Sequence, residues 1–264
     1  MIPKIIHYCW FSQDEIPEET KCCIQSWIKW LPEFKIKKWT LKDFDVNNHQ
    51  FTQEALLQKK WAFLTDYVRH YALYHYGGIY LDSDVMLYGP LNSLFDSDFV
   101  SACEYHPSWD DMKKNRNDNI LNSQYKRIGN KIKVYGIGIQ AAVIASIPKH
   151  PLSRKVLDFY DCIDLETVLI NKYTAPTVLA YSMEEYGFRY IDEEQKLQMS
   201  IHLYPTSIIS NHNQKNKKSI AVHWCAGSWI NRSKIGRIRH ELAKLKVYRL
   251  LVSLKNDIQK KLYK

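Results

Sequence analysis

One stretch of the chain, residues 61–90, constrains the fold more than any other, because three local signals follow one another without a gap. From Leu64 onward, apolar side chains recur at three- and four-residue spacing, which predicts an amphipathic helix. The pair Gly77-Gly78 favours an end to that helix. The apolar run at 79–81 has the character of a short buried strand. The stretch therefore predicts a helix, a reversal of the chain and a strand.

That strand ends on two carboxylates, Asp82 and Asp84, separated by one serine. Two charges beside a buried strand are costly unless something compensates them. Carboxylate oxygens are hard ligands that suit Mg²⁺ or Mn²⁺, ions that typically share their coordination shell with phosphate oxygens. The pattern thus indicates a metal and diphosphate site. An ordinary acidic turn is the alternative interpretation, because Asp and Ser are common turn residues.

The segments Thr65-Asp66-Tyr67-Val68-Arg69 and Gly77-Gly78-Ile79-Tyr80-Leu81-Asp82-Ser83-Asp84 resemble the sugar-transferase segment of glycosyltransferase family 32. That family includes yeast-type mannosyltransferases, animal galactosyltransferases and many bacterial capsule or lipopolysaccharide enzymes. The resemblance implies an α/β domain of the GT-A type, with a Rossmann-like mixed sheet. It also implies a UDP- or GDP-sugar donor, Mn²⁺ or Mg²⁺ as cofactor, and retention of the anomeric configuration.

Several residue roles follow from this resemblance. Asp82 and Asp84 would bind the metal, and Asp66 and Arg69 would hold the donor sugar and its phosphates. Asp66 and Arg69 are one helical turn apart, so a purely structural ion pair is the alternative. Tyr80 falls on the same side of the strand as Asp82 and is expected to pack near the diphosphate.

Two further regions are expected to contact the donor. Trp10 follows the apolar run KIIHYC, where a ring at a strand end could stack on the base of the donor; burial in the core is the alternative. Gly138 and Gln140 lie in a segment that, by the resemblance, passes under the donor sugar. Relatives often have Asn where this chain has Gln140.

A second cluster lies near residue 223, in the sequence AVHWCAGSW. His223 leaves a short apolar run and could complete a mixed Asp/His metal shell, although a histidine packed in the core is the alternative. The resemblance also implies that Ser228 and Trp229 close over the diphosphate.

The C-terminal 32 residues, 233–264, predict a helix with an aliphatic face and a basic face. They hold ten Lys or Arg residues against two acidic ones and therefore carry almost all of the net charge of +9. Such a helix is typical of anionic membrane surfaces, and a helix packed on the domain is the alternative. No nucleic-acid reader motif accompanies the charge, so nucleic acid is not an expected partner. We therefore divide the chain into a transferase domain, 1–232, and a helical tail, 233–264.

Two weaker expectations concern local structure. Residues 106–130 are polar and without periodicity, which predicts a long loop, interpreted as a flap on the acceptor side. Residues 188–191 are expected to form a short strand.

The cellular setting is also an expectation. The six cysteines have no C-x-x-C spacing, and the chain opens on a strand pattern rather than a signal peptide. These features favour a bacterial enzyme of the cytoplasm, held peripherally at the inner face of the membrane by its tail.

The function expected is a metal-dependent retaining hexosyltransferase that moves a sugar from a nucleotide-sugar to a glycan or lipid-linked acceptor in bacterial surface polysaccharide synthesis, such as capsule or lipopolysaccharide. Two alternatives remain. A phosphohydrolase of the haloacid dehalogenase type also has D-x-D after a strand, although its nucleophile normally lies near the start of the chain. A non-catalytic sugar-binding protein at a membrane surface is the other.

Overall fold

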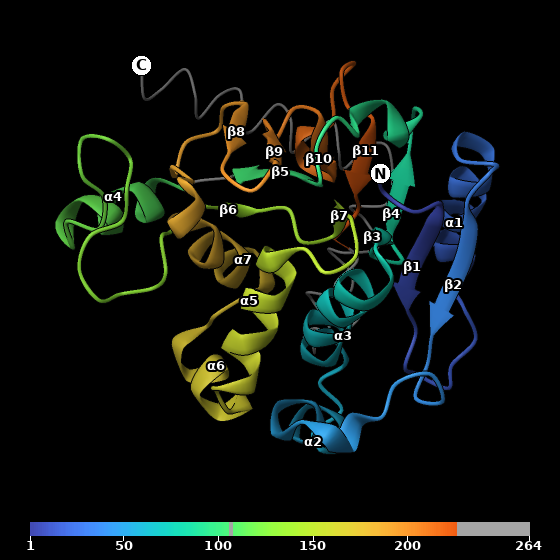
Figure 1. The fold of residues 1–264 in the computed structure, drawn as a ribbon. Helices are drawn as coiled ribbons and strands as arrows, with labels where there is room; N and C mark the ends of the chain where they lie inside the picture. Colours follow the sequence, from blue (N-terminus) through green and yellow to red (C-terminus); the bar gives the residue numbers. More distant parts are fainter. Residues whose placement is uncertain (106–107, 226–264) are drawn as a thin grey trace, which may run out of the picture. The chain divides into compact units, whose positions relative to one another are not determined.

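The computed structural model describes residues 1–105 and 108–225 (Figure 1). Ser228, Trp229 and the tail at 233–264 lie outside the described residues, so the tail helix, the domain boundary at 232 and the roles of those two side chains stay predictions.

The described part is built around a mixed sheet of eight strands with the order β2-β1-β3-β7-β5-β9-β8, to which β6 adds beside β5. A second sheet of three strands has the order β10-β11-β4. The strands of the large sheet are β1 (Ile5–Cys9), β2 (Lys35–Trp39), β3 (Gly78–Leu81), β5 (Phe99–Tyr105), β6 (Ile137–Ile139), β7 (Val143–Ser146), β8 (Gln195–Leu197) and β9 (Ile201–Tyr204). Those of the small sheet are β4 (Val85–Leu87), β10 (Ile209–Asn211) and β11 (Ala221–His223).

Helices flank the large sheet, and short 3₁₀ turns connect several elements (Figure 1). The α-helices are α1 (Glu18–Trp30), α2 (Gln50–Leu57), α3 (Trp61–Tyr76), α4 (Trp109–Asn117), α5 (Pro151–Asp161), α6 (Leu165–Asn171) and α7 (Ala175–Met183). The 3₁₀ turns are η1 (Val46–Asn48), η2 (Leu91–Leu94), η3 (Glu184–Tyr186) and η4 (His212–Gln214). None of the helices within 1–105 and 108–225 is long and apolar enough to cross a bilayer. The expected GT-A type α/β fold with a mixed sheet is confirmed.

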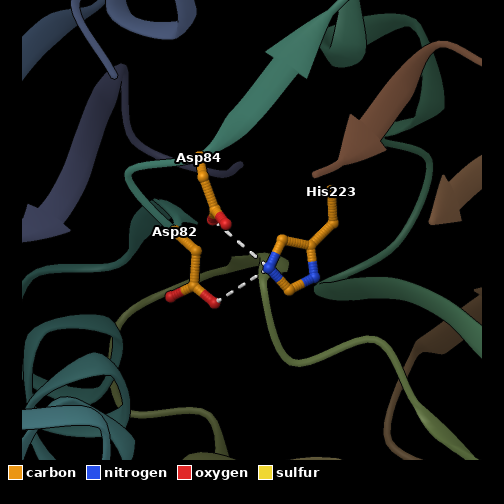
Figure 2. Close-up of side chains that lie close together, drawn as sticks. All are labelled: Asp82, Asp84 and His223. Atoms are coloured by element: carbon orange, nitrogen blue, oxygen red, sulfur yellow. Dashed lines mark ion pairs between the residues drawn. The ribbon is translucent and has the colours of Figure 1, made fainter. Parts of the chain in front are cut away.

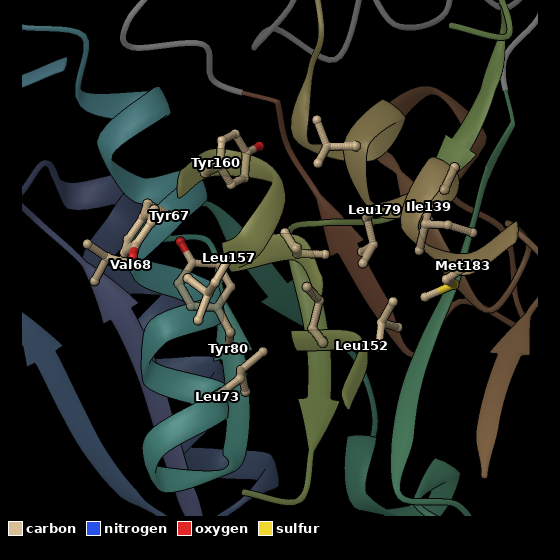
Figure 3. Close-up of a cluster of buried hydrophobic side chains, with 14 of the residues drawn as sticks. Tyr67, Val68, Leu73, Tyr80, Ile139, Leu152, Leu157, Tyr160, Leu179 and Met183 are labelled. Carbon is tan, nitrogen blue, oxygen red and sulfur yellow. The ribbon is translucent and has the colours of Figure 1, made fainter. Parts of the chain in front are cut away.

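Both faces of β3 are buried, which explains its continuous apolar sequence. Tyr80 belongs to the core on the face covered by α3, α5 and α7, where large side chains interlock (Figure 3). Ile79 and Leu81 belong to the core on the other face, together with Trp27 of α1. The Trp27 indole N–H donates to the carbonyl of Val85 over 2.7 Å and so fixes α1 against β4. Successive side chains of a strand alternate between faces, so a strand covered on both sides is apolar throughout.

The reversal between α3 and β3 depends on its two glycines. Gly77 has φ +62° and Gly78 has φ +101°, in the region that L side chains rarely adopt. A Cβ on Gly78 would also lie 2.5 Å from the carbonyl oxygen of Ile5 in the neighbouring strand. The glycines therefore allow α3 to turn directly into a central strand.

Two local expectations were wrong. The polar region 106–130 contains α4, which begins at a capping box in which Ser108 and Asp111 each bond the other's backbone N–H. The helix lacks an apolar stripe, so the search for periodicity missed it, although the Ser-x-x-Asp spacing is a recognised start signal. Residues 188–191 form no strand; the edge strand is instead β8.

Candidate metal and sugar-nucleotide site

The direction of the strands gathers the predicted site residues at one edge of the large sheet. β1 runs parallel to β3, and β7, which is antiparallel to both β3 and β5, lies between those two strands. The carboxyl ends of β1, β3 and β5 therefore share an edge. Trp10 follows β1 and Asp82 follows β3 at this edge, where ligands collect in open α/β sheets.

A tight turn places the two aspartates. The backbone N–H of Val85 donates to the carbonyl of Asp82 over 3.0 Å, which closes a four-residue turn. The Asp82 backbone N–H donates to the carbonyl of Ala142 over 2.9 Å and ties the start of the turn to the large sheet. The chain then enters β4 of the small sheet. The Asp82–Asp84 pair thus forms the junction between the two sheets.

His223 reaches this turn through strand pairing, although it lies far away in the sequence. In the antiparallel pairing of β11 with β4, His223 stands opposite Val85, directly after Asp84. The backbone N–H of Trp224 donates to the Asp84 carbonyl over 3.1 Å. This pairing carries the imidazole to the two carboxylates.

Asp82, Asp84 and His223 offer ligand atoms that lie within 4.8 Å of one another (Figure 2). The Nε2 atom of His223 is 3.2 Å from an Asp84 oxygen and 3.9 Å from an Asp82 oxygen. Its Nδ1 atom faces the other way and lies 3.5 Å from the Cys225 sulfur. Two carboxylates and one imidazole nitrogen directed at a common point form a donor set that suits a divalent cation.

The electrostatics of His223 agree with this arrangement. Burial by itself would lower the pKa of His223, but the Asp84 carboxylate raises that pKa well above its ordinary value. Without a metal, the imidazolium therefore compensates the aspartates at neutral pH. A cation that binds Nε2 must displace that proton.

Arg69 and Tyr80 orient Asp82 from the side of the large sheet. The Tyr80 hydroxyl donates to Oδ1 of Asp82 over 2.6 Å, and Nη2 of Arg69 lies 3.6 Å from the same oxygen. The Arg69 guanidinium also stacks 4.9 Å from the centre of the Tyr80 ring. It is Oδ2, the other oxygen of Asp82, that faces His223.

Asp66 and Arg69 form the buried ion pair that the sequence left open as an alternative, with Nη2 2.8 Å from an Asp66 oxygen. Nη1 of Arg69 donates to the carbonyl of Ala141 over 2.6 Å. Burial raises the pKa of Asp66 to about 7, although Arg69 acts in the opposite direction. An ion pair in contact with Asp82 is compatible with donor binding, so the donor role of both residues stays a prediction.

The remaining predicted contacts are less directly joined to the metal group. Trp10 is partly buried, and its indole N–H donates to the Asp14 carbonyl over 3.0 Å, which fixes the ring beside the edge. Gly138 is buried in β6, where a Cβ would approach Pro176 to 2.9 Å. Gln140 is buried and donates to Asn211 over 2.9 Å.

Three contributors to the site were missed in the sequence. Asn211 and Glu104 form hydrogen bonds behind Gln140, and Cys225 lies against the ring of His223. Each belongs to a different strand or loop from the residue it contacts, except Cys225. Its spacing of two residues from His223 was the one available signal.

Comparison with known proteins agrees with this geometry. Residues 17–100 match the family model described as "Glycosyltransferase sugar-binding region containing DXD motif". The chain is similar to inositol phosphoceramide mannosyltransferase 2 of Schizosaccharomyces pombe, with 27% identity over 161 residues, which is 60% of this chain and 38% of that protein. It is also similar to inositol phosphoceramide mannosyltransferase 3 of the same organism, with 31% identity over 112 residues, 41% of this chain and 29% of that protein.

The match therefore spans well under half of each curated relative. Among solved structures, the chain aligns with the PaToxG glycosyltransferase at 17% identity and a TM-score of 0.49, over 70% of this chain and 69% of that one. The expected resemblance is confirmed: at residues 17–100 this chain carries the DXD-containing sugar-binding region of the glycosyltransferases.

Proposed function

We propose that the chain is a metal-dependent, retaining glycosyltransferase that moves a hexose from a UDP- or GDP-sugar to a glycan or lipid-linked acceptor. The observation that carries the proposal is the group of Asp82, Asp84 and His223, which lies directly after the strand of the matched DXD region. In this proposal, Mn²⁺ or Mg²⁺ supplies positive charge that stabilises the departing nucleoside diphosphate.

The residues of the chain contribute binding and orientation. Asp82 and Asp84 hold the cation, and His223 in its neutral form supplies a nitrogen ligand through Nε2. Tyr80 and Arg69 keep Asp82 turned toward that position by binding its other oxygen. The Arg69 guanidinium offers donors in a planar fork that suits a phosphate oxygen. No residue is assigned as a nucleophile.

The names of the curated relatives favour a particular donor and acceptor. Both are mannosyltransferases that act on inositol phosphoceramide, a membrane lipid. GDP-mannose and a lipid-linked acceptor are therefore the first pair to test. A role in bacterial surface polysaccharide synthesis stays a prediction.

Donor hydrolysis provides the decisive experiment, because it needs no acceptor. We expect slow, Mn²⁺-dependent release of nucleoside diphosphate from one member of a panel of UDP- and GDP-sugars. Asp84→Asn should abolish the release, whereas Asp158→Asn, which removes an exposed carboxylate of α5, should not. Turnover that persists in excess chelator would contradict the metal dependence. Release of inorganic phosphate from simple phosphoesters would favour the phosphohydrolase, and binding without turnover would favour the sugar-binding protein.

The stereochemical part of the proposal has its own test. With an α-linked donor, the product should be an α-glycoside, which the anomeric proton coupling and shift in an NMR spectrum identify. A β-glycoside from such a donor would place the chain in the inverting class.

The proposed location, the inner face of the cytoplasmic membrane, rests on the sequence of the tail. Each Lys or Arg near an anionic surface contributes about 1 kcal/mol, and this attraction weakens with salt. A chain truncated at Ile235 should hydrolyse donor normally but no longer sediment with vesicles that contain phosphatidylserine. If the intact protein ignores such vesicles at low salt, a helix packed on the domain is the better interpretation.

A further inference from the structure

The two sheets contribute different parts of the metal group, so their relative position sets its spacing. Asp82 ends β3 of the large sheet, whereas His223 ends β11 of the small sheet. The strand next to β11 is β10, and its last residue, Asn211, stands opposite His223 in parallel register. The Asn211 side chain is buried and leaves the small sheet to contact residues of the large one.

A chain of three hydrogen bonds runs through Asn211. Its Nδ2 atom donates to the Glu104 carboxylate over 3.1 Å, and its Oδ1 atom accepts from Nε2 of Gln140 over 2.9 Å. The Oε1 atom of Gln140 in turn accepts from the backbone N–H of Ala142 over 3.3 Å. Side chains from β5 and β10 and from the loop after β6 are thus connected in series.

The carboxylate at one end fixes the orientation of both amides. An ionised carboxylate only accepts hydrogen bonds, so Asn211 must turn its NH₂ group toward Glu104. The Asn211 oxygen then faces Gln140, which must present its own NH₂ group. This leaves the Gln140 oxygen for Ala142. A buried polar chain in which each member satisfies the next is rigid, and a reversal of one amide would leave unpaired groups.

The far end of this chain is the backbone that holds the site. The carbonyl of Ala141 accepts from Arg69 over 2.6 Å, and the carbonyl of Ala142 accepts from the backbone N–H of Asp82 over 2.9 Å. Gln140 is itself fixed by its backbone N–H, which donates to the carbonyl of Ala102 over 2.8 Å. The segment 140–142 therefore carries the position of Asn211 to Arg69 and Asp82.

We propose that Asn211 is a positioning residue that, through Glu104 and Gln140, couples the strand pair carrying His223 to the backbone that holds Asp82, and so sets the spacing of the metal group. This inference rests on the proposed function, in that the group binds a divalent cation. Asn211 acts through strand pairing and through the segment 140–142, not as a ligand.

Direct titration with Mn²⁺ alone tests the proposal, with the electron paramagnetic resonance signal of free Mn²⁺ as the readout. Asn211→Leu removes both side-chain hydrogen bonds at similar volume. We expect a fall in Mn²⁺ affinity of about tenfold or more, in the range of about 10–100-fold found for residues that orient metal ligands. The matched control is Ser210→Ala on the same strand, which removes buried hydrogen bonds to Thr206 and Ser219. This control should lose stability but keep its Mn²⁺ affinity.

An exchange of partners keeps the test decisive if Asn211→Leu does not fold. Asn211→Asp places a second carboxylate against Glu104 and should weaken Mn²⁺ binding through repulsion. Adding Glu104→Gln supplies an NH₂ group to that new carboxylate while Gln140 still donates to it. We expect the double variant to recover most of the affinity.

The outcomes separate the inference from the function beneath it. Wild-type affinity in Asn211→Leu, or no recovery in the double variant, would overturn the inference alone. Absence of Mn²⁺ binding by the wild-type protein would overturn the metal proposal and the inference with it.

Discussion

Replacement of Arg69 by methionine is the perturbation whose cost the structure defines most closely. Methionine keeps much of the apolar stem but removes the guanidinium. Three contacts are lost together: the ion pair with Asp66 at 2.8 Å, the hydrogen bond to the Ala141 carbonyl at 2.6 Å, and the 3.6 Å approach to Asp82. Breaking a buried ion pair from one side typically costs about 3–5 kcal/mol, and an unpaired buried carbonyl costs about 1–3 kcal/mol.

Protonation of Asp66 limits this loss. Burial already raises the pKa of Asp66 to about 7 with Arg69 in place, and removal of the cation raises it further. At pH 6, the Asp66 carboxyl is therefore largely neutral in both proteins. We expect Arg69→Met to lower the free energy of unfolding by about 3 kcal/mol there, the lower end of the range for a broken buried pair.

The deficit should grow as the pH rises above about 7, the wild-type pKa of Asp66. A carboxyl whose pKa is raised in the folded state loses stability with rising pH, because the unfolded chain ionises more readily. The variant has the higher folded pKa, so it continues to lose stability after the wild type has ionised. Adding Asp66→Asn should remove this pH-dependent part of the deficit.

Urea unfolding at pH 6 and pH 8.5, in the presence of chelator, measures the effect. Lys21→Met is the matched control, since its ion pair with Glu18 is exposed and such pairs contribute about 0–1 kcal/mol. A loss below about 1 kcal/mol for Arg69→Met, or a deficit that shrinks with rising pH, would refute this account of the pair.

Three further predictions concern the metal group. Asp84→Asn should cost more Mn²⁺ affinity than the about 10–100-fold typical of residues outside the ligand shell; calorimetric titration checks this, and near-wild-type affinity would contradict the ligand assignment. The Mn²⁺ affinity of the wild type should rise with pH by up to about tenfold per unit below the raised pKa of His223, because binding displaces one proton; a His223→Ala variant should show a flatter profile. Cys225→Ala should weaken Mn²⁺ binding more than Cys225→Ser, which retains a polar atom near Nδ1 of His223; equal affinities would mean that the thiol does not orient the ring.

The success of the sequence analysis followed the range of the interactions involved. Residues 61–84 were predicted well because helix, glycine reversal, strand and turn are determined by near neighbours in the chain. The position of His223 depends on the pairing of β11 with β4, which no local pattern specifies. The resemblance to known sugar transferases supplied that residue instead. Asn211 and Glu104 were missed for the same physical reason, since an amide or a carboxylate at a strand end is ordinary until its partner is known.

The charges of the site explain why a metal site can remain stable before its metal arrives. Asp66, Asp82 and Asp84 would repel one another, but Arg69 contacts the first two and the imidazolium of His223 compensates the third. A divalent cation exchanges for the single proton on His223 and adds one net positive charge to the group. That added charge is what a nucleoside diphosphate requires from the site. The raised pKa of His223 therefore stabilises the metal-free group and makes metal binding weaker as the pH falls.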